Sequence, residues 1–425
     1  MNVLILGAGG REHALARKIA ESPSCGHLYI AQGNAGTAKE GTNLQVNPED
    51  FDAVAEAVRK HAVDLILVGP EAPLVKGIRD YFEALPEFDA LRIIGPGKAG
   101  AQLEGSKDFA KAFMARHDIP TARYGTFTAA ELKEAETFLE TFEPPYVLKA
   151  DGLAGGKGVL ILDNLDEARR QLGLMLRDAK FGVASLKVVI EAFLDGIELS
   201  VFALTDGTDY VLLPEAKDYK RIGEGDTGLN TGGMGAVSPV PFSDAAFSEK
   251  VKQRIVEPTV RGLAAEGIPY FGFIFFGLIK VNGDPFVIEY NVRMGDPETE
   301  AVVPRISSDL LELLKAAADG KLSGKKIEFD PRHAATVMAV SGGYPESYGK
   351  GKKISGLNIP SDISVYHAGT AEKDGDTITA GGRVLAVTAL GENLKQAVDD
   401  AYARMSTIEF EGLYVRRDIG GEFIG

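Results

Sequence analysis

Short apolar runs alternate with segments of helical periodicity over the first hundred residues, and this alternation limits the fold more than any other feature. The apolar runs, which end in glycine or polar turns, are Val3–Gly7, Leu28–Ala31, Asp64–Gly69 and Arg92–Gly95. The segments with apolar residues at helical spacing are Glu12–Ala20, Asp52–His61 and Pro73–Ala84. Strands that alternate with helices predict a doubly wound parallel sheet. Ligands of such sheets bind beyond the carboxyl ends of the strands.

A glycine-rich turn, Gly7-Ala-Gly-Gly-Arg11, follows the first of these runs. It fits the dinucleotide-binding fingerprint poorly, because Glu12 stands where a third glycine is needed and Gln32 stands where a ribose-binding acid is expected. Backbone N–H groups at a helix start still suit one phosphate. We therefore expect a mononucleotide-like or sugar-phosphate pocket, and plain tight turns are the alternative. The expected donors are Gly9, Gly10 and Gly36.

Two short apolar runs, Tyr146–Ala150 and Gly158–Leu162, are joined by the loop Asp151-Gly-Leu-Ala-Gly-Gly-Lys157. The residue order of a Walker loop and the helix that follows one are both absent, so we predict a hairpin flap. Lys149 at the end of the first run and the glycine flap would clamp a triphosphate, with the flap closing when nucleotide arrives. A surface hairpin with solvated lysines is the alternative.

The segment Val287–Glu298 places polar residues in an apolar strand. Glu289, Asn291 and Arg293 recur at every second position, so in a strand they point to the same face. Oxygen ligands from Glu289 and Asn291 suit Mg²⁺, which keeps its other positions for water and nucleotide phosphates. Arg293 can neutralise a transferring phosphoryl group. Structural salt bridging is the alternative.

The run Val189–Glu198 has an apolar strand that ends in two spaced carboxylates, Glu191 and Glu198. An adenine slot needs apolar walls, backbone groups for the ring edge and a carboxylate for the ribose hydroxyls, whereas solvated acids at a strand end are the alternative. A glycine-rich run, Gly223–Gly235, has no periodicity and is too polar for a core. Loops of this length inside a compact domain are usually functional.

With 425 residues, the chain is too long for one ordinary compact domain. We expect an α/β and α+β multidomain protein with a Rossmann-like phosphate-binding domain over residues 1–104. A central domain would cover residues 105–325, with a flap subdomain at 120–188, and a small α+β domain residues 326–425. The last domain is predicted from strands at His333–Val340, Ser364–Ala368 and Gly382–Thr388 and a helix at Asn393–Ile408.

Charge and cysteine content exclude several classes. The net charge of −15 repels a polyanion, so we expect no nucleic-acid partner, although small phosphorylated substrates are compatible with it. Cys25 is the single cysteine, which leaves no internal disulfide and fits a reducing compartment. The N-terminus lacks the pattern of a secretory signal, and no apolar run approaches the ~18 residues of a membrane span. We expect a cytoplasmic monomer, or a weak dimer, without membrane contact.

A series of motifs runs along essentially the whole chain. They are Gly-Gly-Arg-Glu-His-Ala (9–14), Gly-Pro-Glu-Ala-Pro-Leu (69–74), Leu-Glu-Gly-Ser-Lys (103–107), Lys-Ala-Asp-Gly-Leu-Ala (149–154), Asn-Thr-Gly-Gly-Met-Gly-Ala (230–236), Gly-Asp-Pro-Glu-Thr (295–299) and Gly-Gly-Arg-Val-Leu (381–385). Together they resemble the phosphoribosylamine–glycine ligase family of the ATP-grasp superfamily. The motifs at 230–236 and 295–299 are distinctive for that family, whereas the lysine and flap motifs are shared by the superfamily. The resemblance implies an N-terminal pre-ATP-grasp sheet and a central ATP-grasp fold.

The resemblance also implies the reaction: glycine and 5-phosphoribosylamine are ligated with ATP, through glycyl phosphate, in de novo purine biosynthesis, with Mg²⁺ or Mn²⁺ as the metal. The implied ATP-binding residues are Lys107, Lys149, Gly155, Gly156, Lys157, Glu191, Ala192, Phe193, Leu194, Glu198, Lys220 and Asn230. The implied metal ligands are Glu289 and Asn291, and the implied catalytic residues are Arg293 and Asp296. The implied substrate-binding residues are Gly9, Gly10, Asn34, Gly36, Glu71, Arg221 and Glu298.

The sequence departs from the family pattern at a few positions. Members commonly carry Phe, Gln and His at the positions of Met294, Glu300 and Tyr219. Met294 conserves bulk and apolarity, and Tyr219 affects only a fine substrate contact.

Three other functions compete with this interpretation. The first is another ATP-grasp carboxylate–amine ligase, against which Asn230–Gly235 argues. The second is a nicotinamide-dependent oxidoreductase, which Glu12 and Gln32 disfavour. The third is a catalytically silent nucleotide sensor, which would be expected to have lost Glu289, Asn291 or Arg293, and the chain retains all of them.

Overall fold

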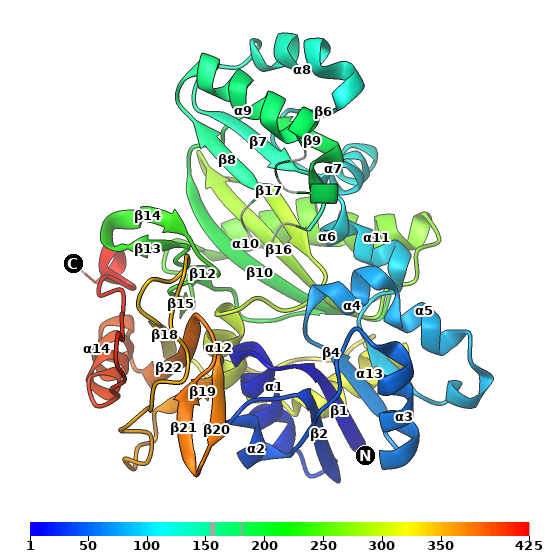
Figure 1. Cartoon of the computed structure of the whole chain (residues 1–425). Coiled ribbons are helices and arrows are strands. Elements are labelled where there is room, and N and C mark those ends of the chain that lie inside the picture. Colours follow the sequence, from blue (N-terminus) through cyan, green and yellow to red (C-terminus); the bar gives the residue numbers. More distant parts are fainter. Residues whose placement is uncertain (154–157, 179, 181, 425) are drawn as a thin grey trace.

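The N-terminal part of the chain is a doubly wound α/β sheet, as the sequence predicts. The computed structural model describes residues 1–153, 158–178, 180 and 182–424 (Figure 1). All strand pairs of the first sheet are parallel, in the order β3-β2-β1-β4-β5. Its strands are β1 (Asn2–Gly7), β2 (His27–Gln32), β3 (Thr42–Leu44), β4 (Leu65–Val68) and β5 (Arg92–Ile94). Its helices are α1 (Gly10–Ala20), α2 (Thr37–Glu40), α3 (Phe51–His61), α4 (Glu71–Lys76) and α5 (Ile78–Glu83).

The prediction of one helix over Pro73–Ala84 is wrong, because the chain forms α4 and α5 with Gly77 between them. Gly77 has a φ of 91°, a left-handed conformation that ends α4. The amide N–H of Gly77 donates to the carbonyls of Pro73 and Leu74, so the break is a helix C-cap.

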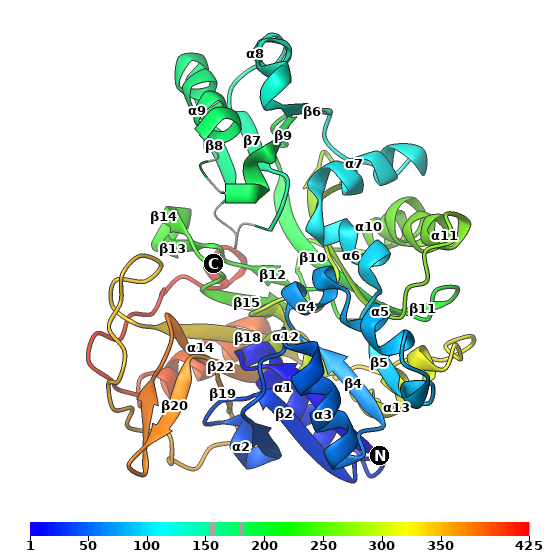
Figure 2. The same ribbon diagram turned by 45° about the vertical axis from the view of Figure 1, so that its right-hand side comes forward.

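The middle of the chain contains an antiparallel sheet in the order β11-β10-β16-β17 and a separate lobe with the order β6-β9-β7-β8. In Figure 1 and Figure 2 the lobe stands above β10, β16 and β17. The sheet strands are β10 (Ile197–Thr205), β11 (Tyr210–Leu212), β16 (Gly272–Val281) and β17 (Asp284–Asn291). The lobe strands are β6 (Tyr124–Thr128), β7 (Tyr146–Ala150), β8 (Val159–Leu162) and β9 (Lys187–Glu191). The helices of this part are α6 (Lys98–Gly105), α7 (Lys107–Arg116), α8 (Leu132–Leu139), α9 (Leu165–Asp178), α10 (Ala245–Val251), α11 (Glu257–Ala265), α12 (Glu298–Val302) and α13 (Leu310–Ala318).

The C-terminal sheet has the order β12-β15-β18-β22-β19, and α14 packs on β18 and β22. Its strands are β12 (Lys217–Asp218), β15 (Gly235–Ser238), β18 (His333–Val340), β19 (Ser364–His367) and β22 (Arg383–Gly391), and α14 is Leu394–Met405. A separate hairpin is formed by β20 (Thr370–Lys373) and β21 (Asp376–Thr379). The sheet takes strands from both sides of residue 325, and the predicted domain boundaries stay predictions. None of the helices in the described part of the chain combines the length and apolar composition that a membrane span requires.

Two further predicted elements differ from the structure. The run Gly223–Gly235 is not an irregular loop, because β13 (Arg221–Gly223) and β14 (Thr227–Asn230) pair as a hairpin. This hairpin is anchored from outside its own sequence, because Arg416 in the C-terminal tail donates to the carboxylate of Asp226 at 2.8 Å. The two carboxylates predicted at the end of one strand lie on two strands, because β9 ends at Glu191 and Glu198 belongs to β10.

The first sheet and the β10–β16 sheet are joined through two shared apolar cores. One core contains Val3 and Ile5 of β1 together with Phe202 of β10 and Leu310 of α13. The other core contains Leu4 and Leu6 of β1 together with residues of β10 and β16. Alternate residues of a strand point to opposite faces, so each strand contributes to both cores. This packing fixes the carboxyl end of β1 relative to β17.

The end of β5 in the first sheet meets the start of β16 at a pair of glycines. The amide N–H of Gly95 donates to the carbonyl of Phe271 at 2.8 Å. Gly272 has a φ of 145°, and a Cβ atom there would lie 2.8 Å from the nitrogen and 3.1 Å from the Cα of Gly95. A side chain at Gly272 would therefore be strained and would also separate the two backbones.

We expect Gly272→Ala to lower the free energy of unfolding in urea more than Gly267→Ala does. At Gly272 the backbone strain costs about 1–3 kcal/mol, and the collision with Gly95 adds about 1–3 kcal/mol. Gly267 also has a positive φ, 67°, but nothing lies within 4 Å of a Cβ atom there. Its substitution should lose only about 1–2 kcal/mol. Equal losses in the two variants would show that the contact with Gly95 does not hold the sheets together.

Candidate active site

Glu289 and Asn291 lie near the end of β17 and face β16. Glu289 pairs in register with Gly277, and Asn291 pairs with Phe275. A Cβ atom at Gly277 would lie 3.1 Å from Cγ of Glu289, so the missing side chain leaves room for the carboxylate. The register shifts directly after Gly277, and such bulges re-aim side chains next to sites.

Three lysines from different elements gather around this strand end. Lys107 begins α7, Lys149 lies in β7, and Lys220 lies between β12 and β13. The ammonium group of Lys149 lies 3.5 Å from the carbonyl oxygen of Ile288. Burial lowers the pKa of Lys107, while the charge of Glu289 opposes this change, and the same carboxylate acts on Lys220. Cations from three distant segments thus converge on the end of β17, and the Glu289 carboxylate acts on two of them, Lys107 and Lys220, which suits a polyanion bound with a metal.

A buried ion cluster holds Lys149 in place. The Glu191 Oε2 atom lies 3.0 Å from the Lys149 ammonium and 3.1 Å from the Lys111 ammonium, and all three side chains are buried. Burial raises the pKa of Glu191, but the two ammonium groups outweigh it, so the pKa lies below its ordinary value. Burial also lowers the pKa of Lys111, to about 8. The Oε2 atom of Glu191 is therefore engaged with both lysines, whereas its buried Oε1 atom has no hydrogen-bond partner among the described residues.

Lys111 was missed by sequence reasoning, although a signal was present. It lies on the buried face of α7 with Ala110, Phe113 and Met114. A lysine on an apolar helix face needs a buried partner, and the spacing of the helix alone does not say which one. The structure supplies Glu191 and the hydroxyl of Thr121, to which Lys111 donates at 2.7 Å.

Asp151 ties the strand that carries Lys149 to the start of α7. Its Oδ1 accepts hydrogen bonds from the Asp108 amide at 2.8 Å and from the Ser106 hydroxyl at 3.0 Å. Its carbonyl accepts from the Lys107 amide at 3.1 Å. The two lysines are therefore held by one connected set of bonds.

Glu198 and Lys220 form an ion pair of 2.5 Å beside these lysines. The charge of Lys220 lowers the pKa of Glu198 below its ordinary value. The segment Ala192–Leu194 links β9 of the lobe to β10, and the amide of Ala192 donates to the carbonyl of Arg123 at 2.8 Å. Phe193 is exposed in this link. The predicted ATP-binding residues Gly155, Gly156 and Lys157 lie outside the described residues.

The prediction that Arg293 shares a strand face with Glu289 is wrong, because β17 ends at Asn291. The guanidinium of Arg293 instead lies between two carboxylates, 2.8 Å from Glu104 Oε1 and 3.4 Å from Glu71 Oε2. Burial raises the pKa of Glu104 to about 7, and the charge of Arg293 opposes this rise. Glu104 also accepts the amide of Val292 at 2.8 Å, so it fixes the turn that carries Arg293.

The glycine loops of the first sheet lie against the C-terminal part of the chain. The Gly9 amide donates to Glu12 at 2.6 Å, and the Gly36 amide donates to the Asn34 side chain at 2.8 Å. Asn34 in turn donates to the carbonyl of His367 at 2.7 Å. These bonds occupy two of the three expected phosphate donors in this structure. Their role in binding a phosphate stays a prediction.

Asp296 and Glu298 lie beyond Arg293, next to the first glycine loop. The Asp296 carboxylate lies 2.9 Å from the Arg383 guanidinium, and a Cβ atom at Gly9 would lie 3.1 Å from Asp296 Oδ2. Glu298 is buried and accepts the hydroxyl of Ser200 at 3.2 Å. Burial, aided by the charge of Asp218, raises the pKa of Glu298 to about 7.

The hairpin β13–β14 brings Arg221 opposite Asn230, as residues that pair in register. Arg221 donates to the carbonyl of Gly228 at 2.8 Å within the hairpin. The adjacent turn is held from β22, because Arg383 donates to the carbonyl of Gly232. Arg383 lies in a motif that the sequence resemblance identified, but its partners could not be derived from that motif.

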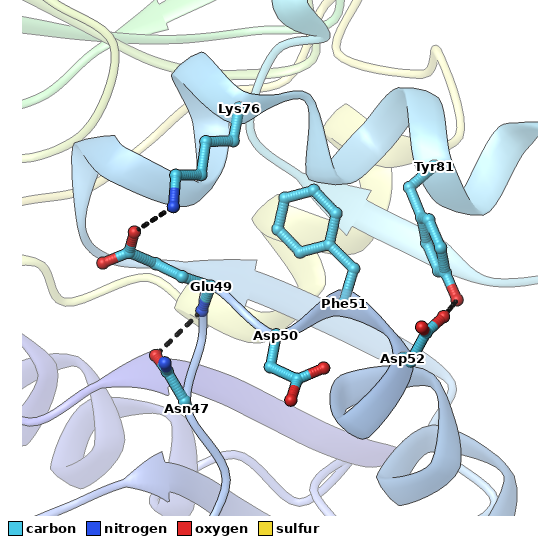
Figure 3. A pocket seen from close by; sticks show the side chains of 7 residues that line it. All are labelled: Asn47, Glu49, Asp50, Phe51, Asp52, Lys76 and Tyr81. Carbon is cyan, nitrogen blue, oxygen red and sulfur yellow. Dashed lines mark hydrogen bonds and ion pairs between the residues drawn. The ribbon is translucent and has the colours of Figure 1, made fainter.

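An open depression elsewhere on the surface is separate from these residues (Figure 3). Its polar groups bond to one another, since Lys76 pairs with Glu49 at 2.5 Å and the Tyr81 hydroxyl donates to Asp52 at 2.5 Å. It contains none of the predicted site residues. It is lined by Asn47, Glu49, Asp50, Phe51, Asp52, Lys76 and Tyr81.

Comparison with protein families matches three models that together cover most of the chain. The N domain of phosphoribosylglycinamide synthetase matches residues 1–104, and its ATP-grasp (A) domain matches residues 105–299. The C domain of the same synthetase matches residues 334–422. The site residues described above lie in all three matched segments.

Comparison with individual proteins finds relatives of the same family. The phosphoribosylamine–glycine ligase of Vibrio vulnificus is 47% identical over 99% of this chain and 98% of its own length. A solved structure of the phosphoribosylamine–glycine ligase of Thermotoga maritima is 37% identical, with a TM-score of 0.84 over 99% of this chain and 100% of that chain. Biotin carboxylase of Campylobacter jejuni has a TM-score of 0.73 at 17% identity, which is a likeness of fold alone.

The cluster of Glu191, Lys111 and Lys149 leads to a stability prediction. We expect Glu191→Gln to lower the free energy of unfolding by about 3–5 kcal/mol, because it leaves the buried ammonium groups of Lys111 and Lys149 without a counter-charge. Lys111→Met should lose less, because Lys149 remains to pair with Glu191. Urea unfolding checks both.

Lys18→Met is the control for the loss of a lysine as such. Lys18 pairs with the exposed Glu21 at 2.9 Å, so its substitution should change stability by about 0–1 kcal/mol. If Glu191→Gln loses no more than Lys111→Met does, compensation of the two lysines by Glu191 is not what stabilises the cluster.

Proposed function

The chain belongs to the phosphoribosylglycinamide synthetase family, and from this premise we propose that it joins glycine to 5-phosphoribosylamine in an ATP-dependent reaction. The products are glycinamide ribonucleotide, ADP and phosphate, in de novo purine biosynthesis. The observation that carries the proposal is the 47% identity to a phosphoribosylamine–glycine ligase over 99% of this chain. The family resemblance inferred from the sequence motifs and the predicted fold class are confirmed.

ATP occupies the space between the lobe and β17 in this proposal. Lys107 and Lys149 bind its phosphates. In support, the charge of Glu289 acts on Lys107, and the Lys149 ammonium lies 3.5 Å from the Ile288 carbonyl and is fixed by Glu191. Adenosine lies against the link between β9 and β10. The residues that we assign to the nucleotide, besides the two lysines, are Gly155, Gly156, Lys157, Glu191, Ala192, Phe193, Leu194, Glu198, Lys220 and Asn230.

Glu289 and Asn291 are the proposed ligands of Mg²⁺ or Mn²⁺. A carboxylate and an amide oxygen are hard donors, and Mg²⁺ is usually held by one or two carboxylates together with substrate phosphates. No group of three or more His, Cys, Asp or Glu that could hold a metal occurs among the described residues. The donor set therefore fits a metal shared with the nucleotide. When bound, the metal neutralises phosphate charge.

Arg293 acts in the phosphoryl transfer. The carboxylate oxygen of glycine attacks the γ-phosphorus of ATP, which forms glycyl phosphate and releases ADP. Arg293, held between Glu104 and Glu71, places its positive charge on the transferring group. The amine nitrogen of phosphoribosylamine then attacks the acyl carbon, phosphate leaves, and the nitrogen loses a proton.

The second substrate lies between the first sheet and the C-terminal part. Gly9, Gly10, Asn34 and Gly36 take its phosphate, and Asp296 and Glu298 orient the amines. Support comes from position, because Asp296 Oδ2 and the Gly9 turn are neighbours. Glu71 and Arg221 complete the substrate contacts.

Another ATP-grasp carboxylate–amine ligase is the remaining alternative. The fold is shared with carboxylases such as the biotin carboxylase of Campylobacter jejuni, so the fold does not choose the acceptor. The glycine turn at Gly232 and Gly233 favours the ribosylamine reaction, because it lies in the motif distinctive for that family. Arg383 donates to the carbonyl of Gly232, and Gly233 packs against Pro297. We place the enzyme in the cytoplasm, which the single cysteine Cys25 supports.

ADP release should require glycine and phosphoribosylamine together. A coupled assay that follows ADP should show turnover with both substrates and only background when either is omitted. Bicarbonate in place of glycine serves as the control for carboxylase activity. Turnover with bicarbonate, or with glycine and no ribosylamine at the same rate, would refute the proposed acceptor.

Glu289→Ala should abolish turnover while the fold is retained, because the metal loses an oxygen ligand. Asp284→Ala is the matched control, since Asp284 lies at the other end of the same strand and its carboxylate pairs with Lys250 and Arg254. Circular dichroism checks folding, and the ADP assay with a titration of Mg²⁺ checks activity. Full activity of Glu289→Ala at saturating Mg²⁺ would contradict the metal assignment.

A further inference from the structure

Glu300 is a carboxyl group buried in α12 without a hydrogen-bond donor. Its side chain is 0% exposed, and within the described part of the chain neither of its oxygens has a hydrogen-bond partner. The Gly10 backbone lies directly against it, since a Cβ atom at Gly10 would collide with Glu300 Oε1. An ionised carboxylate without partners in such a place costs far more than a neutral acid.

The two arginines near Glu300 are paired with other carboxylates. Arg11 of α1 pairs with Glu12 at 2.6 Å, and Arg383 of β22 pairs with Asp296 at 2.9 Å. Strands β15 and β18 face α12 with alanines, Ala236 and Ala334. The titratable and charged groups that interact with Glu300 are Asp296, Arg383, Arg11 and Tyr366, and Glu298 acts on Arg383.

Arg383 connects β22 to the turn at Asp296 and to the glycine turn at Gly232. Its Nη1 donates to the Asp296 carbonyl at 2.7 Å and to the Gly232 carbonyl, and its Nη2 pairs with the Asp296 carboxylate. A second carboxylate at Glu300 would compete for the same guanidinium. It would draw Arg383 away from Asp296 and from the glycine turn.

We propose that Glu300 is an uncharged carboxylic acid in the folded protein and that it acts as a positioning residue. Because Glu300 is neutral, Arg383 remains free to hold Asp296 and the glycine turn. The positioning role rests on the proposed function, which assigns Asp296 to the amine substrates. Gln has nearly the same shape as Glu and carries no charge. Burial and the charge of Asp296 raise the pKa of Glu300 well above its ordinary value, and Arg383 opposes this only in part.

Infrared difference spectra of the wild type and Glu300→Gln test the protonation state directly. At neutral pH the wild type should show a carbonyl stretch of a protonated carboxyl that the variant lacks. Asp206→Asn is the matched control: Asp206 is also buried, but accepts the amides of Leu322 and Asp209, which help to lower its pKa. That control should lose no protonated carbonyl band. Loss of a carboxylate band instead of an acid band in Glu300→Gln overturns the proposal.

Unfolding as a function of pH gives a second test without turnover. A carboxyl whose pKa is raised in the folded state binds a proton more tightly there than in the unfolded chain, so its contribution to stability is lost as pH rises. The wild type should therefore become less stable relative to Glu300→Gln as pH rises above about 4.3, the ordinary value of the group. A melting-temperature difference that stays constant from acid to neutral pH would argue against a neutral acid.

Activity tests the positioning role. At alkaline pH, kcat/KM of the wild type should fall more steeply than that of Glu300→Gln, with the change in the KM of phosphoribosylamine and not in that of ATP. Parallel pH profiles overturn the positioning role while leaving the proposed function intact. Absence of glycine-dependent ADP release by the wild type overturns the proposed function and the positioning role together, and the infrared result then still decides the protonation state.

Discussion

Two sheets bury both of their faces in the same pair of apolar cores, and this shared burial holds the site together. Side chains of β1 alternate between the cores, with Ile5 beside Phe202 and α13 in one and Leu6 in the other. Each such side chain contributes about 1.5–3 kcal/mol when fully buried. Because both sheets share these cores, the loop after β1 and the end of β17 are fixed relative to each other. Asp296 can therefore lie beside Gly9, although 287 positions separate them in the sequence.

Around these cores, neighbouring charges set the pKa of each buried carboxyl group. Glu191 is ionised because two lysines flank it, whereas Glu104, with a single guanidinium, has a pKa of about 7. Neither oxygen of Glu300 has a hydrogen-bond partner in the described part of the chain. The pKa values of the carboxyl groups in the site thus differ according to the balance between burial, which raises them, and the neighbouring cations, which lower them.

Much of the fold could be predicted because it depends on local patterns. The alternation of strands and helices predicted the parallel sheet, and the hairpin of β7 and β8 followed from two apolar runs around a glycine loop. The prediction of an irregular loop over Gly223–Gly235 was wrong, because the turn between β13 and β14 is held by Arg416 from the C-terminal tail. The prediction that Arg293 lies in the strand was wrong, because periodicity does not show where a strand ends.

The sequence by itself determined the family, the fold class and the candidate residues, because motifs and periodicity are properties of neighbouring positions. Only the tertiary structure decided their partners. It placed the carboxylate of Glu191 against Lys111 and Lys149, engaged the Gly9 and Gly36 amides, and left Glu300 without a donor. Ion pairs, hydrogen bonds and burial join residues that are far apart in the chain, so no local pattern contains them.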